Sequence, residues 1–277
     1  MRKISPLLMK KSRLFVDIIL PVVLYSVILL VAQLVIMIAM TVVYYAAHTG
    51  EDALVIAEKA EEFLLDNAML ISLLGNIFTF VVIFIDSKIR KVRISDYTQL
   101  SKPIGLRGGI SAVLCGMSFS MWLSIMLSLL PIPESWMNDY ADASASLNET
   151  SLIAVIATAV AAPIIEEMLF RGIIYRHLCI CLPEYLSLVI QAVIFAVLHG
   201  DTIIWVSYAL LGGLLFGYIR MLTGSIRATI LAHMTFNLIG YVVEFLGQGL
   251  VTFLIMVSPI VLIFSVRDMY KQSIKSE

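Results

Sequence analysis

The sequence predicts an all-α membrane protein that crosses the bilayer about eight times and encloses a buried polar site. Its 277 residues are 60% hydrophobic and only 14% charged, and their mean hydropathy is +0.97. A soluble domain carries about 25% charged residues. The apolar residues also fall in long runs, which suit helices that span the hydrocarbon core. The net charge of −1 gives no reason to expect a nucleic-acid partner, so the expected surroundings are the lipid bilayer.

Eight apolar segments follow one another along the chain. We expect membrane helices at about 18–45, 69–85, 109–130, 151–182, 185–199, 203–220, 227–245 and 251–266. The fifth segment is short, so the turn after it is expected either as an outer loop or as a turn buried within the protein. An even number of crossings puts both termini on one side of the membrane.

Lysine and arginine are concentrated at the N-terminus and after the second segment. These basic residues are Arg2, Lys3, Lys10, Lys11, Arg13, Lys88, Arg90, Lys91 and Arg93. The connections at 51–66 and 134–149 are acidic instead. The positive-inside rule places the basic stretches in the cytoplasm. We therefore expect an integral, multi-pass protein of a bacterial cell membrane with both termini cytoplasmic.

The fourth segment contains two adjacent carboxylates, Glu166 and Glu167. Ionisable residues at membrane depth are costly, so this pair indicates a functional site. Adjacent helical residues point about 100° apart and need different partners. Arg171 is four residues after Glu167, and the two could form an ion pair that stabilises the fold or orients the site. Glu166 has no such local partner and is the candidate general base.

Three later residues could reach the depth of Glu166. If the fourth and fifth segments form a hairpin that turns near Pro183, Glu166 and His199 each lie ~25 Å from that turn. His233 and Asn237 are four residues apart in the seventh segment and share one helix face. His199 could instead be a satisfied core histidine or a helix-end residue, and His233 with Asn237 could be interhelical hydrogen-bond partners.

Pro163 lies three residues before Glu166. A proline inside a helix frees a carbonyl and bends the axis. We expect this bend to open a cavity for water and substrate.

The order and spacing of these polar residues resemble the three motifs of the CPBP intramembrane proteases. The motifs are Glu166-Glu167-x-x-x-Arg171, Phe195-x-x-x-His199 and His233-x-x-x-Asn237. This family includes the CAAX prenyl endopeptidases and bacterial proteins linked to bacteriocin processing or self-immunity. The resemblance covers about residues 150–240 and implies an eight-helix membrane fold. It also implies that Glu167 and Arg171 support the site by holding the first motif in shape.

The resemblance further implies four catalytic residues. Glu166 would activate the attacking water, and His199 would help to position that water. His233 and Asn237 would stabilise the oxyanion, as donors directed at developing charge do.

Family members are widely called metalloproteases, and Glu166, His199 and His233 could ligate a divalent metal such as Zn²⁺. The sequence contains no HExxH motif. A metal-free mechanism can be written from the same residues, and we expect no obligatory metal.

The resemblance predicts an intramembrane endopeptidase for a small peptide or a membrane-tethered protein. One alternative is a non-catalytic immunity or scaffold protein that retains the protease fold. Another is a transporter that uses Glu166 and the histidines as a proton relay, although we find no internal repeat that would favour transport. We expect residues 1–150 to be scaffold helices, 151–245 the catalytic helices, and 246–277 the last helix with a cytoplasmic tail. Nothing in the sequence indicates a prenylated substrate.

Overall fold

The computed structural model describes residues 19–50, 52–145, 151–200 and 202–274. Within these ranges the regular elements are helices, without a strand. Seven helical segments are long and apolar enough to cross a membrane, and the shorter apolar helix α11 completes the expected set. The predicted all-α, multi-pass membrane fold is confirmed. The basic stretch at 2–13 and Asp201 of the turn after α11 lie outside the described residues.

The chain forms its spanning segments in the predicted order. Their bounds are α2 Leu20–Ala47, α4 Ala68–Ile89, α6 Leu106–Leu129, the composite span Leu152–Cys181, α11 Glu184–Leu198, α12 Ile203–Thr223, α13 Ile226–Val243 and α14 Gln248–Ile274. Three further helices are not spans: α3 (Ala53–Asp66), α5 (Ile94–Tyr97) and α7 (Glu134–Ala145).

The span at 152–181 alternates between two helical forms. It consists of α8 (Leu152–Val155), the π-helix η3 (Ile156–Ala161), α9 (Ala162–Glu167), the π-helix η4 (Met168–Ile174) and α10 (Tyr175–Cys181). π-segments are rare and occur mostly at functional sites. Both carboxylates of the first motif therefore lie in a short α-helical stretch between two π-segments.

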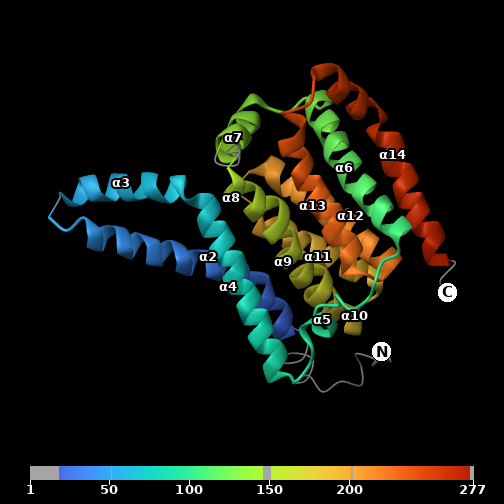
Figure 1. Cartoon of the computed structure of the whole chain (residues 1–277), viewed down its shortest axis with the longest axis horizontal. Helices are drawn as coiled ribbons and strands as arrows, with labels where there is room; N and C mark the ends of the chain where they lie inside the picture. Colours follow the sequence, from blue (N-terminus) through green and yellow to red (C-terminus); the bar gives the residue numbers. More distant parts are fainter. Residues whose placement is uncertain (1–18, 51, 146–150, 201, 275–277) are drawn as a thin grey trace.

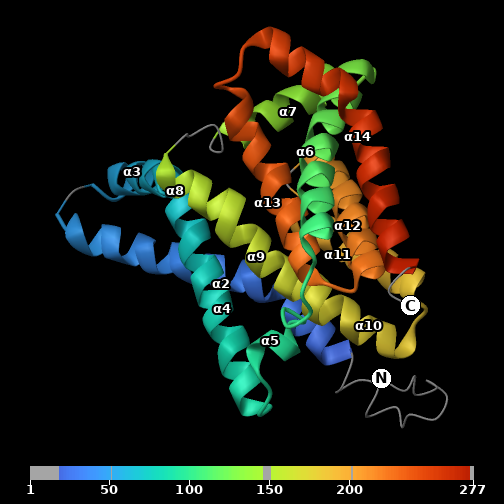
Figure 2. The same ribbon diagram turned by 45° about the vertical axis from the view of Figure 1, so that its right-hand side comes forward.

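This composite span lies at the centre of the molecule (Figures 1 and 2). It contacts α2 and α4 on one side and α13 on the other. Behind α13 pack α6 and α14, while α11 pairs with α12. The far end of α2 projects from this group together with α3, while α4 runs beside the composite span (Figure 1). Half of the most apolar part of the composite span is buried, the largest share among the seven spans, which matches its central place.

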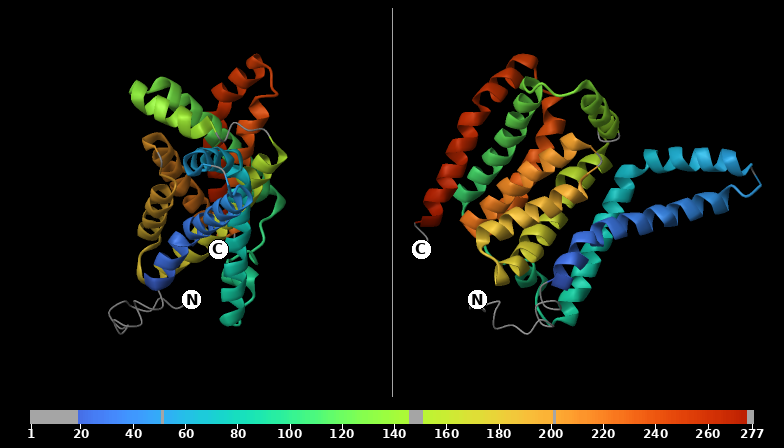
Figure 3. Two further views of the ribbon diagram at one scale, coloured as in Figure 1. Left: turned by 90° about the vertical axis from the view of Figure 1, so that its left-hand side faces the viewer. Right: turned by 180° about the vertical axis from the view of Figure 1, so that it is seen from behind.

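The molecule has two distinguishable ends (Figures 1, 2 and 3). One end carries α7, the start of α8 and the connection between α13 and α14, and we call it the α7 end. The other carries α5, α10, the start of α2 and the end of α14, and we call it the α5 end. The active-site motifs lie between these two ends.

A polar cluster fixes α5 against α2 and α4. The Tyr25 and Tyr97 hydroxyls are 3.0 Å apart, and Tyr25 also donates to Asp86. The Arg90 Nε donates to the same carboxylate at 2.7 Å. Burial raises the pKa of Tyr97 to about 12, so its hydroxyl stays protonated at neutral pH. This cluster closes the α5 end over the composite span.

Candidate active site

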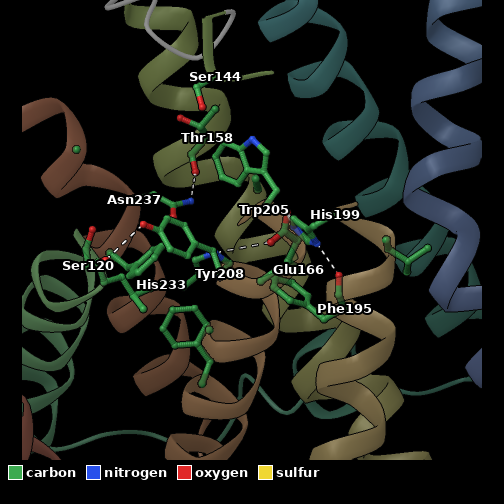
Figure 4. A pocket seen from close by; sticks show the side chains of 18 of the residues that line it. Ser120, Ser144, Thr158, Glu166, Phe195, His199, Trp205, Tyr208, His233 and Asn237 are labelled. Carbon is green, nitrogen blue, oxygen red and sulfur yellow. Dashed lines mark hydrogen bonds and ion pairs between the residues drawn. The ribbon is translucent and has the colours of Figure 1, made fainter. Parts of the chain in front are cut away.

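The carboxylate of Glu166 lies between two imidazole rings (Figure 4). Its Oε1 is 3.7 Å from Nε2 of His199, and its Oε2 is 3.8 Å from Nε2 of His233. Both separations exceed a direct hydrogen bond. The structure thus brings together three residues from α9, the C-terminal cap of α11 and α13, which the sequence had placed at a common depth.

Both histidines use Nδ1 to hold the ring in place. His199 Nδ1 is 2.7 Å from the carbonyl oxygen of Phe195, which can only accept, so Nδ1 carries a hydrogen. His233 Nδ1 is 2.9 Å from Oε1 of Glu167. With Nδ1 protonated, a neutral ring presents an Nε2 lone pair to Glu166, and only the imidazolium form can donate from that atom.

The two rings differ in access to the cavity. The side chain of His199 is 32% exposed, whereas that of His233 is only 7% exposed. Phe195 lies against His199 with ring centres 4.1 Å apart, and Phe216 stacks on His233 at 4.6 Å. These aromatic contacts restrict the tilt of each imidazole, because a packed ring cannot turn freely.

Glu167 and Arg171 form a fully buried ion pair. Arg171 Nη1 donates to Oε1 of Glu167 at 2.8 Å, and neither side chain is exposed. Arg171 Nη2 also donates to the carbonyl oxygen of Gly213 at 3.2 Å, and its guanidinium lies over the ring of Phe195 at 4.7 Å. Buried charges need partners of this kind. Arg171 is therefore held beneath the site, out of reach of a ligand in the cavity.

Asn237 is anchored by a carbonyl that Pro163 leaves free. In η3 the N–H of Ala162 bonds to the carbonyl of Ala157, five residues back. In the same register the carbonyl of Thr158 would pair with residue 163, which is proline and has no N–H. Asn237 Nδ2 donates to that Thr158 carbonyl at 2.7 Å instead (Figure 4).

Thr158 makes a second link between η3 and α13. Its hydroxyl is 2.9 Å from the hydroxyl of Tyr241 and 2.9 Å from the carbonyl oxygen of Ala154. Thr158, Tyr241 and Phe216 belong to none of the sequence motifs. Thr158 lies five residues before Pro163. This spacing indicates a free carbonyl only when the helix is known to be a π-helix, in which each carbonyl pairs with the residue five positions later.

The site opens into a cavity of about 780 Å³. Its volume falls in the range of ligand pockets, roughly 300–1,000 Å³. The wall includes apolar side chains such as Leu29 of α2 and a row of hydroxyls, Ser120, Ser124 and Ser128, at helical spacing on α6. Helices outside the motif region thus form part of the cavity wall.

The described residues include no group of three His, Cys, Asp or Glu side chains that could hold a metal ion. Glu166, His199 and His233 share the cavity without forming such a group.

The region that contains the three motifs matches a known protein family. Residues 148–239 match the family described as Rce1-like, type II CAAX prenyl endopeptidase Rce1-like. The matched segment runs from α8 through most of α13 and contains every motif residue. No curated protein and no solved structure matches the chain. The match confirms the resemblance to the CPBP intramembrane proteases that the three motifs predicted.

Proposed function

We propose that this multi-pass membrane protein, with its Rce1-like segment at residues 148–239, is an intramembrane endopeptidase that activates water with Glu166. One observation carries the proposal. Glu166 faces the Nε2 atoms of His199 and His233 at 3.7 and 3.8 Å, beside a cavity of about 780 Å³ that can admit a peptide segment.

In the first step, Glu166 takes a proton from water as the water oxygen attacks the scissile carbonyl carbon. A C–O bond forms, and the carbonyl oxygen takes the negative charge. His199 suits the positioning of this water, because its Nε2 faces both the cavity and Glu166 and can accept a hydrogen bond. Such positioned proton transfer contributes about 10²- to 10⁴-fold in rate.

His233 and Asn237 are the proposed oxyanion donors. Asn237 has two amide hydrogens, of which one is directed to Thr158, so the second is available to the oxyanion. His233 must carry both ring protons to donate from Nε2. The Glu167 carboxylate, 2.9 Å from Nδ1, holds the ring so that Nε2 faces Glu166 and the cavity. When the tetrahedral intermediate collapses, the C–N bond breaks and Glu166 returns its proton to the leaving nitrogen.

The test is cleavage of a peptide library by purified protein in detergent, followed by mass spectrometry. We expect Glu166→Gln to lose cleavage by about 10²- to 10⁴-fold, since the amide cannot accept the proton. Glu184→Gln is the matched control, because Glu184 is exposed at the start of α11 and does not line the cavity.

Equal cleavage by the two variants would overturn the proposal. A thermal unfolding scan of each variant separates lost chemistry from lost folding. Unfolding of Glu166→Gln alone would favour a structural role for the polar cluster, as in the non-catalytic alternative.

A further inference from the structure

From Glu166 the cavity extends along α6 and α13 toward the α7 end, and on α2 its lining also includes Tyr25 and Ser26. On α6 the lining residues run from Ser120 to Ser128, which is the half of the helix nearest α7. On α13 they run from His233 to Tyr241 and continue to Glu244 at its C-terminal cap, again toward the α7 end. Among the described residues, none from α5, α10 or α14 lines this cavity.

The other direction is closed by buried side chains. Glu167 and Arg171 are completely buried just beyond Glu166. Gly172 packs so closely on α5 that a Cβ atom there would lie 2.4 Å from the carbonyl oxygen of Thr98. The core continues below them through residues that are at most 1% exposed, namely Ile173, Ile174 and Ile226. These buried residues close the side of the composite span that faces α5, directly beneath Glu166.

The cavity is also acidic toward its mouth. Among the described residues that line it there is no lysine or arginine, while Glu244 lines it near the α7 end. The neighbouring helix α7 carries only acidic charged residues, Glu134, Asp139 and Asp142. A positively charged segment would be attracted to such a mouth.

The charge distribution also gives the orientation in the membrane. Except for Lys59 of α3 and the buried Arg171, the described lysines and arginines lie in or next to the connections and helix ends of the α5 end. Cytoplasmic loops carry this excess. The α5 end is then cytoplasmic, and the cavity opens on the opposite side.

We propose that the substrate is a positively charged polypeptide segment that reaches Glu166 from the extracytoplasmic face, through the α7 end of the cavity. This inference rests on the proposed endopeptidase function. The bond to be cleaved lies at membrane depth beside Glu166, and the basic part of the segment lies near Glu244. A prenylated C-terminus on a cytoplasmic protein would meet the closed α5 end instead.

The test is labelling of single cysteine variants by a membrane-impermeant, charged maleimide, on intact cells and after permeabilisation. Ser124→Cys places a thiol on the cavity wall, and Ser128→Cys repeats the measurement one turn nearer the α7 end. Ser101→Cys is the matched control, because Ser101 is exposed beside α5.

The native cysteines provide an internal control. Cys115 is buried, and Cys179 and Cys181 are partly exposed in α10, at the α5 end. We expect the wild type and Ser101→Cys to react only after permeabilisation. Ser124→Cys and Ser128→Cys should already react in intact cells, and permeabilisation should add only the labelling that the wild type shows.

The reverse pattern would overturn the inference, and so would the absence of labelling at both cavity positions. The labelling requires no catalysis, so it is repeated with Glu166→Gln in the same chain. Extracytoplasmic labelling together with full cleavage by Glu166→Gln would reject the proposed mechanism and leave the entry route intact. Loss of cleavage in Glu166→Gln together with labelling only from the cytoplasm would support the proposed mechanism and reject the extracytoplasmic entry route.

Discussion

Two adjacent glutamates in one short helix have entirely different surroundings. Glu166 faces two imidazoles at distances beyond a hydrogen bond, beside the cavity. Glu167 is sealed beneath it and bonds to Arg171 and His233 at 2.8 and 2.9 Å. Successive side chains on a helix diverge by about 100°, so one can face the cavity while the next faces the core.

This difference predicts that the same substitution changes the stability of the fold far more at Glu167 than at Glu166. Glu167→Gln leaves the Arg171 charge buried without its partner, which costs ~3–5 kcal/mol for a buried pair. Glu166→Gln removes no ion pair within hydrogen-bond distance and should change the unfolding temperature little. Thermal unfolding of both variants in the same detergent measures the contrast. Equal stability of the two variants would contradict the assignment of Glu167 to a structural pair.

Also at the residue scale, the side chains around Glu166 predict that a metal chelator does not abolish activity. The described residues form no group of three ligands for a metal, and the proposed steps need only the carboxylate, the rings and an amide. Cleavage is expected to continue in EDTA. If a chelator stopped cleavage and Zn²⁺ restored it, a metal-dependent mechanism would replace the proposed one.

At the scale of the element, the π-helix η3 provides the Thr158 carbonyl that accepts a hydrogen bond from Asn237, because Pro163 has no N–H to occupy it. Replacing Pro163 with alanine restores an N–H that competes with Asn237 for the Thr158 carbonyl. Asn237 then loses the bond that fixes its amide.

We expect Asn237→Ala to lower kcat by about 10²- to 10³-fold, the usual cost of losing one oxyanion donor. Pro163→Ala should also lower kcat, but by a smaller factor, and should change KM little. Tyr241→Phe is the control, since it removes a hydroxyl contact to Thr158 but leaves the hydrogen bond from Asn237 to the Thr158 carbonyl in place. If Pro163→Ala matched this control in steady-state kinetics, the proline would have no role in positioning Asn237.

At the scale of the whole molecule, the acidic mouth predicts a preference among substrates. Glu244→Gln should raise KM for peptides whose lysine or arginine residues lie far enough from the cleaved bond to reach the cavity mouth, and should leave neutral peptides unaffected. The difference should shrink at high salt, because exposed charges are screened. Kinetics with paired basic and neutral peptides at two ionic strengths measure it. An equal change for both peptides would argue against charge recognition at the mouth.

The sequence by itself determined the membrane class, the order of the spanning segments and the residues to compare in depth. These follow from local rules, because the bilayer requires apolar runs of a set length and a helix has a fixed rise per residue. The expected common depth of Glu166 and His199 needed no more than this arithmetic. The structure brings these two side chains within 3.7 Å of each other.

Only the tertiary structure decided which neighbours those residues meet. The ring of Phe216 against His233, the carbonyl of Thr158 under Asn237 and the closed α5 end all depend on contacts between helices far apart in the chain. The two π-segments likewise arise where α2, α4 and α13 pack around the span at 152–181. Hydropathy and spacing describe each helix alone, and a cavity is formed by the side chains that several helices direct toward one another.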